Sequence, residues 1–258
     1  MPAPDPPVQV SRAIEWLDSV GSTNEVAFQR AALGERGPLW IAANRQTGGR
    51  GRSGRHWVSP PGNLHASLLV TFPRLLPTVP QLSLVAGLAA CQTVQHLAPG
   101  LIFRLKWPND VLMDGAKLAG ILIEGRMMPG SNAHNVVIGI GINLAHHPEL
   151  DARRSTSLAA LGVSADPPLA LECLAGALEH WLAIWAGGEG LPAVREAWMS
   201  RALTAGTAVT VNTGREMIEG QFVGLDPDGS MVLRLADGGQ RLITFGDVHI
   251  GAPPGADF

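Results

Sequence analysis

Residues 105–125 read LKWPNDVLMDGAKLAGILIEG, and this stretch decides the fold class. Its proline ends one apolar strand, and a second apolar run follows at 111–113. Asp114-Gly115 is a strong signal for a two-residue hairpin, because such a turn favours residues that tolerate a positive φ. The apolar run at 118–125 then returns as the partner strand. Strands joined directly by hairpins predict an α+β protein rather than a strict βαβ alternation.

The same stretch holds both lysines of the chain, Lys106 and Lys117, whereas the other 17 basic residues are arginine. Lysine is a compact point charge on a flexible stem, while arginine is a wide planar fork. Two ammonium groups within 12 positions therefore indicate a narrow pocket where a carboxylate and a phosphate are neutralised together. Chance combined with a codon bias toward arginine is the alternative explanation.

Outward from this stretch, the sequence predicts further strands and helices of ordinary length. A helix is expected to open at Ser22, since Ser22 and Glu25 have the spacing of a capping box, and Gly34 stops it. The other predicted strands lie at 12–18, 39–44, 63–72, 101–107 and 136–144, and the other predicted helices at 81–97, 169–185 and 191–202.

The composition changes after Thr204. Short alternating runs punctuated by glycine-containing turns follow, which is typical of a small β-barrel of about five strands. We therefore divide the chain into a larger domain at 1–203 and a small module at 204–258. The barrel strands that the pattern identifies are 208–211, 218–225, 231–235 and 241–245.

The bulk composition excludes several protein classes. A length of 258 residues, with 46% hydrophobic and 16% charged residues, indicates a compact globular protein. The net charge of −3 argues against nucleic-acid binding by overall electrostatics. The longest apolar stretch, 82–90, is too short for a membrane span, so no membrane contact is expected. Cys91 and Cys173 are expected to be reduced, as in a cytoplasmic protein. The histidines show no metal-ligand spacing.

Residues 48–57 read GGRGRSGRHW, which places four glycines and three arginines in ten positions. Glycines let the backbone approach a ligand, and guanidinium groups suit phosphate or carboxylate. The segment lacks the Gly-Lys-Ser/Thr ending of a P-loop. A solvated basic loop and a nucleic-acid loop are the alternatives, and the acidic net charge disfavours the second.

Together, the arginine loop at 48–57 and the lysine segment suit a reaction in which a carboxylate attacks the α-phosphate of a nucleotide. Both reactants are anionic, so the site must neutralise them, align them and exclude water. Asn109 and Asp110 could orient Lys117 or bind a metal or a ribose, and a plain turn is the alternative. The run 139–143, GIGIN, could let a flat ligand lie against the backbone, or it could reflect tight strand packing.

Three strings give the chain a family resemblance: GRGRSGRHW at 49–57, KWPND at 106–110 with KLAGILIE at 117–124, and IGIGINL at 138–144. In this order they resemble biotin protein ligases. The resemblance implies a catalytic domain at 1–203 with a mixed β-sheet of the class II synthetase-like type, and an SH3-like barrel at 204–258. It implies that biotin and ATP form biotinyl-5′-AMP, whose biotinyl group passes to a carrier lysine.

The resemblance also implies roles for individual residues. Lys117 would lie between the biotin carboxylate and the α-phosphate, and Lys117 and Arg52 would be catalytic. Residues expected to bind biotin are Ser22, Thr23, Asn24, Gln46, Gly49, Arg50, Arg52, Lys117, Gly120, Gly139 and Gly141. Residues expected to bind the nucleotide are Arg52, Arg55, Trp57, Asn109, Asp110, Lys117 and Asn143.

The expected co-substrate is ATP with Mg²⁺, the expected partner is a biotin carboxyl carrier protein or domain, and the metal ligands stay open. About ten residues precede the first predicted strand, too few for the winged-helix domain of regulatory members, so specific DNA binding is not expected. The chain could be a monomer or a homodimer. A lipoate–protein ligase and a non-catalytic biotin-sensing protein are the alternatives. The barrel is expected either to dock the carrier or complete the nucleotide site, or only to cap the helices at 169–202.

Overall fold

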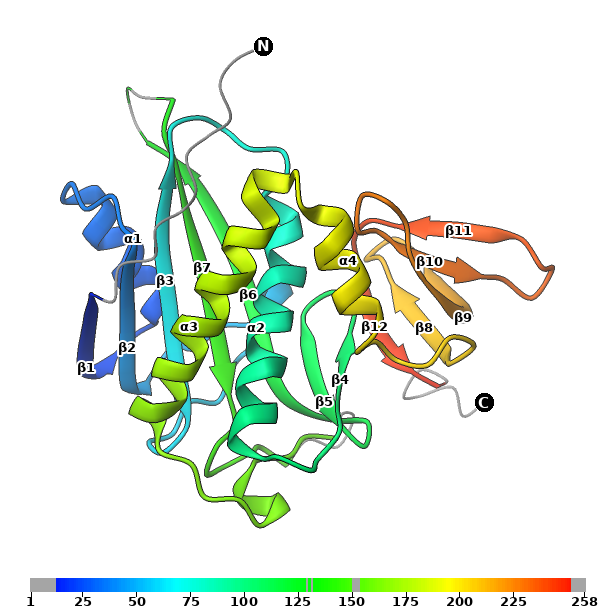
Figure 1. The fold of residues 1–258 in the computed structure, drawn as a ribbon, viewed down its shortest axis with the longest axis horizontal. Coiled ribbons are helices and arrows are strands. Elements are labelled where there is room, and N and C mark those ends of the chain that lie inside the picture. Colours follow the sequence, from blue (N-terminus) through cyan, green and yellow to red (C-terminus); the bar gives the residue numbers. More distant parts are fainter. Residues whose placement is uncertain (1–12, 129, 131, 150–153, 252–258) are drawn as a thin grey trace.

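A computed structural model describes residues 13–128, 130, 132–149 and 154–251. Its main element is a seven-stranded sheet in the order β1-β2-β3-β7-β6-β5-β4 (Figure 1). The β1 and β2 strands are parallel and the other neighbours are antiparallel, so the sheet is mixed, as expected. The strands are β1 (Ile14–Val20), β2 (Leu39–Gln46), β3 (Leu64–Phe72), β4 (Phe103–Lys106), β5 (Asp110–Met113), β6 (Ala116–Met127) and β7 (His134–Ile142).

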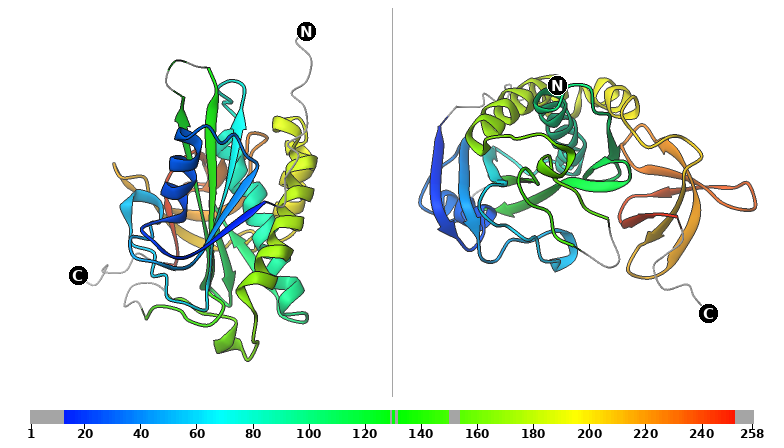
Figure 2. Two further views of the ribbon diagram at one scale, coloured as in Figure 1. Left: turned by 90° about the vertical axis from the view of Figure 1, so that its left-hand side faces the viewer. Right: turned by 90° about the horizontal axis from the view of Figure 1, so that it is seen from below.

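Helices cover both faces of this sheet (Figure 2). The α1 helix (Thr23–Ala32) lies on one face, where Ala27 and Phe28 pack against Ile41. The α2 helix (Leu82–Leu97) and the α3 helix (Pro167–Trp185) cover the other face. Burial of apolar side chains on both faces fixes the register of the strands, because a one-residue slip would move every core side chain to the opposite face.

A second, five-stranded antiparallel sheet has the order β11-β10-β9-β8-β12. It packs against α4 (Leu191–Met199), where the rings of Trp198 and Phe222 meet edge to face at 6.5 Å. One buried apolar core runs through both sheets. The strands are β8 (Ala208–Asn212), β9 (Met217–Leu225), β10 (Met231–Arg234), β11 (Gln240–Ile243) and β12 (Asp247–Ile250).

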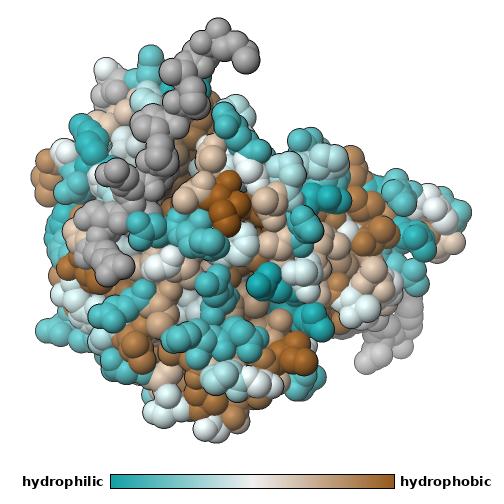
Figure 3. All heavy atoms as spheres, in the orientation of Figure 1, coloured by the Kyte–Doolittle hydropathy of each residue, from teal (hydrophilic) through white to brown (hydrophobic). Residues whose placement is uncertain are grey.

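The segment Pro167–Gly188 is long and apolar enough to cross a membrane, although no apolar stretch of that length was expected. Its apolar side is nevertheless buried in this fold, with Leu174, Leu178 and Trp185 in the core. Its outer side carries exposed Glu172 and Glu179. Figure 3 shows apolar and hydrophilic side chains interspersed over the face that includes α3. Because one side of this helix is buried and apolar and the other is exposed and charged, it is an amphipathic core helix.

Most predicted elements agree with the structure, and the deciding hairpin is confirmed. Asp114 and Gly115 both have positive φ, 48° and 77°, as a type I′ turn requires. Cys91 and Cys173 are free, as expected.

Two details differ. The capping box is wrong, since Ser22 occupies the N-cap position but its side chain makes no cap hydrogen bond. Glu25 instead pairs with Arg126, with N–O distances of 2.9 and 3.4 Å. The fifth barrel strand, β12, was not located by the pattern.

Candidate active site

A cavity of about 520 Å³ opens between the arginine loop, the large sheet and strand β12. It brings together almost all the residues that the sequence singled out. Those that line it are Ser22, Thr23, Asn24, Gln46, Arg50, Arg52, Arg55, Trp57, Asn109, Asp110, Lys117, Gly120, Gly139, Gly141 and Asn143.

Gly49 is the exception among the predicted residues, because it is buried and does not line the cavity. A Cβ atom at this position would lie 2.4 Å from the Trp57 carbonyl oxygen and 2.7 Å from Ser59 Oγ. Gly49 therefore permits close packing behind the cavity wall rather than contact with a ligand.

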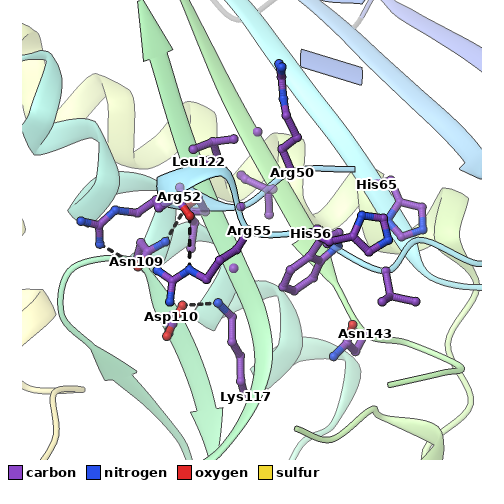
Figure 4. A pocket seen from close by; sticks show the side chains of 18 of the residues that line it. Arg50, Arg52, Arg55, His56, His65, Asn109, Asp110, Lys117, Leu122 and Asn143 are labelled. Carbon is purple, nitrogen blue, oxygen red and sulfur yellow. Dashed lines mark hydrogen bonds and ion pairs between the residues drawn. The ribbon is translucent and has the colours of Figure 1, made fainter. Parts of the chain in front are cut away.

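One end of the cavity is charged, with Asp110 between the two lysines. Its carboxylate oxygens lie 2.8 Å from Lys106 Nζ and 2.5 Å from Lys117 Nζ. Asp110 is buried, whereas the Lys117 side chain keeps 30% exposure. Figure 4 shows Lys117 extending toward Asp110, so the carboxylate fixes where this ammonium is held. Lys106 also donates to the carbonyl oxygen of Val248 at 2.9 Å.

Local backbone structure explains why Lys117 projects into the cavity. The pairing of β5 with β6 shifts register between Val111 and Leu112, which leaves Leu118 as the extra residue of a bulge. Lys117 lies opposite Leu112 of β5, and its backbone also bonds to the segment 154–156: its N–H donates to Arg154 O, and its carbonyl accepts from Thr156 N–H, both at 2.9 Å. Bulges beside active sites commonly redirect a side chain in this way.

The charges at this end shift one another's pKa values. Burial works to raise the pKa of Asp110, but the charges of Lys106 and Lys117 outweigh it and hold that pKa well below its usual value. Burial lowers the pKa of Lys117, and the Asp110 carboxylate opposes that shift. The site therefore holds an ionised carboxylate within a surplus of positive charge, which suits anionic ligands.

The arginine loop reaches the same end of the cavity and joins it to the barrel. Arg52 donates to Asn109 Oδ1 at 3.3 Å and to the carbonyl oxygen of Gly246 at 3.2 Å. Burial lowers the pKa of Arg52, partly offset by the carboxylate of Asp247. Arg55 forms an ion pair with Asp247 on β12. Two of the three loop arginines are therefore held by the end of the barrel.

Arg50 takes a different direction, away from Lys117 and Asp110 in Figure 4. Its guanidinium lies 3.6 Å from Glu25 and 3.8 Å from Glu124, and its side chain keeps 45% exposure. Exposed pairs at such distances contribute little to stability. Arg50 is consequently the loop arginine with the weakest protein contacts.

Side chains, not open space, cover the glycines of β6 and β7. A Cβ on Gly139 would lie 2.3 Å from Asn24 Oδ1, and one on Gly141 would lie 2.6 Å from Trp57 Nε1. The Trp57 ring is also 5.3 Å from Lys117 Nζ, measured to the ring centroid. In this arrangement the glycines seat Asn24 and Trp57, and those side chains stand where a ligand was expected to meet backbone.

The other end of the cavity is neutral and is built from hydrogen bonds. Gln46 Oε1 accepts from the Thr23 backbone N–H at 2.8 Å and from Thr23 Oγ1 at 3.1 Å. Ser67 Oγ lies 2.7 Å from Thr23 Oγ1 and 2.6 Å from Asn24 Oδ1. Asn24 also donates to Glu124 at 2.7 Å. The start of α1 and the ends of β2 and β3 thus present amide and hydroxyl groups.

Lys106, His65 and Asp247 are among the residues that line the cavity but were absent from the predicted site. The rarity of lysine singled out Lys106, which lies four residues before Asp110, but it was not given a role in binding biotin or the nucleotide. His65 is buried, and its Nε2 contacts the carbonyl oxygen of Pro60 at 3.1 Å. Nothing in the local sequence marked Asp247, because its strand lies far along the chain and its partner Arg55 is in another domain.

Among the described residues, no group of three or more His, Cys, Asp or Glu side chains is arranged to hold a metal ion. The carboxylates that line the cavity are Asp110 and Asp247. Mg²⁺ usually binds through one or two carboxylates together with substrate phosphates, and this donor set fits that mode.

Family models match both parts of the chain. Residues 16–143 match the model of the Biotin/lipoate A/B protein ligase family, and residues 204–251 match that of the Biotin protein ligase C terminal domain. A relative from Paracoccus denitrificans, named biotin–[acetyl-CoA-carboxylase] ligase, is 37% identical over 243 residues, which cover 91% of this chain and 99% of the relative.

Two solved structures are similar over almost their whole length. The biotin protein ligase from Aquifex aeolicus in complex with biotin and ATP has a TM-score of 0.77 and 29% identity, covering 93% of this chain and 99% of that one. The biotin protein ligase from Leishmania major in complex with biotinyl-5-AMP has a TM-score of 0.60 and 28% identity, covering 91% of this chain and 100% of that one.

Proposed function

Because the chain belongs to the biotin/lipoate A/B protein ligase family, we propose that it is an ATP-dependent biotin–protein ligase. The observation that carries the proposal is the pairing of a neutral, hydrogen-bonding end with a cationic end in one cavity. Biotin has the same division, with a neutral cyclic urea at one end and a carboxylate at the other. The names of the relatives and the ligands in the solved structures support the same reaction.

In the first step, an oxygen of the biotin carboxylate attacks the α-phosphorus of ATP. The new P–O bond gives biotinyl-5′-AMP, and pyrophosphate leaves. Two anions must approach each other, so preorganised positive charge lowers the barrier. Lys117 supplies that charge where the carboxylate meets the α-phosphate, and Asp110 orients its ammonium at 2.5 Å. Arg52 adds a second cation on the loop side.

In the second step, a neutral lysine amine of the carrier attacks the biotinyl carbonyl. The C–N bond forms, AMP leaves, and the amine loses a proton. The cavity must exclude water until then, because water would hydrolyse the mixed anhydride. The arginine loop, which lies over the site with Arg52 and Arg55 held to the barrel, is suited to that purpose.

The residue roles follow this division. Ser22, Thr23, Asn24 and Gln46 bind the neutral ring of biotin, and Arg50 joins them by leaving its weak carboxylate contacts. Arg55, Trp57, Asn109 and Asn143 serve the nucleotide. Residues 1–203 form the catalytic domain, and the barrel at 204–258 completes the nucleotide side through Asp247.

Magnesium accompanies the nucleotide and neutralises its phosphates. Asp110 and Asp247 are the carboxylates that would help to hold it. Both are already paired with cations of the protein, which suits an ion carried in mainly by the phosphates rather than one bound beforehand.

The acceptor is a biotin carboxyl carrier protein or domain, as the name of the Paracoccus denitrificans relative suggests. The reaction takes place in the cytoplasm, where ATP and the carboxylase are found. Specific DNA binding is not part of the function, and the net charge of −3 is consistent with that.

A lipoate–protein ligase is the second candidate, since the family model includes both activities. The polar network around Thr23 and Gln46 favours biotin, because the dithiolane ring of lipoate has no N–H or C=O to pair with it. The deciding experiment is pyrophosphate exchange into ATP with biotin, lipoate or neither, followed by transfer to a biotin carrier domain. Exchange and carrier labelling with biotin alone are expected. Exchange with lipoate alone, or with neither acid, contradicts the proposal.

A further inference from the structure

The amide of Gln46 is held in one orientation by hydrogen bonds at both of its ends. Its oxygen faces the backbone N–H of Thr23, which can only donate, at 2.8 Å. Its nitrogen therefore points the other way, toward Ser59 Oγ at 2.9 Å. This orientation follows from the Thr23 N–H, which can only donate. It does not rest on the amide alone, whose oxygen and nitrogen have nearly the same shape.

Ser59 is a buried residue behind the cavity wall and does not line the cavity. Its hydroxyl donates to the Trp57 carbonyl oxygen at 3.1 Å, which can only accept. The Ser59 oxygen is then left as an acceptor, and the Gln46 amide nitrogen is the donor that it faces. The Ser59 carbonyl oxygen also accepts from the Gln46 backbone N–H at 3.2 Å. The Thr23 N–H at one end of this chain of hydrogen bonds and the Trp57 carbonyl oxygen at the other therefore require the same orientation of the Gln46 amide.

Gly49 makes this arrangement possible. A Cβ atom there would lie 2.7 Å from Ser59 Oγ, 3.2 Å from Gln46 Nε2 and 2.4 Å from the Trp57 carbonyl oxygen. A side chain at Gly49 would therefore push on all three groups. This accounts for a glycine that the sequence places in the binding loop but that does not line the cavity.

The contacts of the described residues use one of the two hydrogens on Gln46 Nε2. Gln46 lines the cavity, so the second hydrogen is available to a ligand. We infer that Ser59 is a positioning residue that turns the Gln46 amide so that the cavity meets an N–H donor and not a carbonyl. This inference rests on the proposed function, and it selects a ligand with an acceptor at that place, as the carbonyl of a cyclic urea provides.

Calorimetric titration with biotin alone, without ATP, tests this inference. Ser59→Ala leaves the Gln46 nitrogen without its partner, so that only the Thr23 contacts with the oxygen still hold the amide. Losing one oriented hydrogen bond is expected to raise the biotin dissociation constant about tenfold. The affinity for ATP measured without biotin should stay the same. Ser83→Ala is the matched control, because Ser83 Oγ also donates to a backbone carbonyl, that of Pro108 at 2.7 Å, away from Gln46. It should leave the biotin affinity unchanged.

A double-mutant cycle separates positioning from general loosening of the loop. If Ser59 acts through Gln46, Ser59→Ala should have no further effect on biotin affinity once Gln46→Ala is present. Gly49→Ala should weaken biotin binding in the same direction as Ser59→Ala. Unchanged biotin affinity in Ser59→Ala, or effects of the two substitutions that add fully, overturns the inference. Failure of the wild-type protein to bind biotin at all would instead contradict the proposed function.

Discussion

The two ends of the cavity are built by different physical means. The charged end holds Lys106, Asp110 and Lys117, which lie on three consecutive strands and are joined by ion pairs of 2.5 and 2.8 Å. The neutral end joins α1, β2 and β3 through hydrogen bonds around Thr23, Gln46 and Ser67. Charges held out of water act strongly on a reacting phosphate, whereas neutral groups discriminate by geometry. Substitutions at the charged end should therefore impair chemistry, and those at the neutral end should impair recognition.

The largest effect is expected for Lys117→Ala. The substitution removes the ammonium that stands where the carboxylate meets the α-phosphate, and loss of one preorganised charge costs about 10²–10³ in rate. Biotin-dependent pyrophosphate exchange would measure it. Biotin affinity without ATP should fall much less than the rate, because the neutral end still holds the ring of biotin. If a folded Lys117→Ala variant exchanges pyrophosphate at nearly the normal rate, Lys117 does not have this role in the reaction.

Asp110→Asn should destabilise the fold, because it leaves two lysines close together without their carboxylate. Removing one partner of a buried ion pair costs about 3–5 kcal/mol, and the exposure of Lys117 places this case at the lower end. Since the folded pKa of Asp110 is lowered, its contribution is present above the usual carboxyl pKa and is lost as pH falls below it. Thermal unfolding of the wild type and of Asp110→Asn across pH would show a difference in stability at neutral pH that becomes smaller in acid. A difference in stability that does not depend on pH contradicts this prediction.

The barrel extends the charged end, and its contribution should be smaller. Arg55→Ala and Asp247→Ala are each expected to weaken ATP binding several-fold, as loss of a half-exposed ion pair of about 1 kcal/mol implies. Because the two side chains pair with each other, the double variant should be little worse than either single variant. Titrations with ATP and with biotin would show whether the loss is confined to the nucleotide. Equal losses for both ligands would mean that the barrel only stabilises the fold.

An effect of similar, small size is expected at the neutral end. Thr23→Val removes a hydroxyl that lies 2.7 Å from Ser67 Oγ and 3.1 Å from Gln46 Oε1 but keeps the shape of the side chain. The backbone N–H of Thr23 still holds the Gln46 amide. Biotin affinity should fall about three- to tenfold, and the maximal rate of adenylation should stay near that of the wild type. A fall in that rate at saturating biotin would count against the separation of the two ends.

Spacing in the sequence predicted the centre of the charged end, whereas the neutral end was predicted only through the family resemblance, and the reason is physical. Lys106, Asp110 and Lys117 are close in the chain, so strand spacing and a recognisable turn bring them together. Contacts such as Arg55 with Asp247 join residues far apart in sequence and depend on how the barrel packs on α4. The roles of Gly49 and of the covered Gly139 and Gly141 could not be predicted, because they depend on which side chains fill the space beside each glycine.

The measurement that tests the separation most directly compares Lys117→Ala and Thr23→Val in one pair of assays. The assays are biotin affinity without ATP and the rate of pyrophosphate exchange at saturating biotin. Lys117→Ala should lose far more rate than affinity, and Thr23→Val should lose affinity and keep the rate. If both variants lose affinity and rate in the same proportion, the two ends act as a single unit and the account is contradicted.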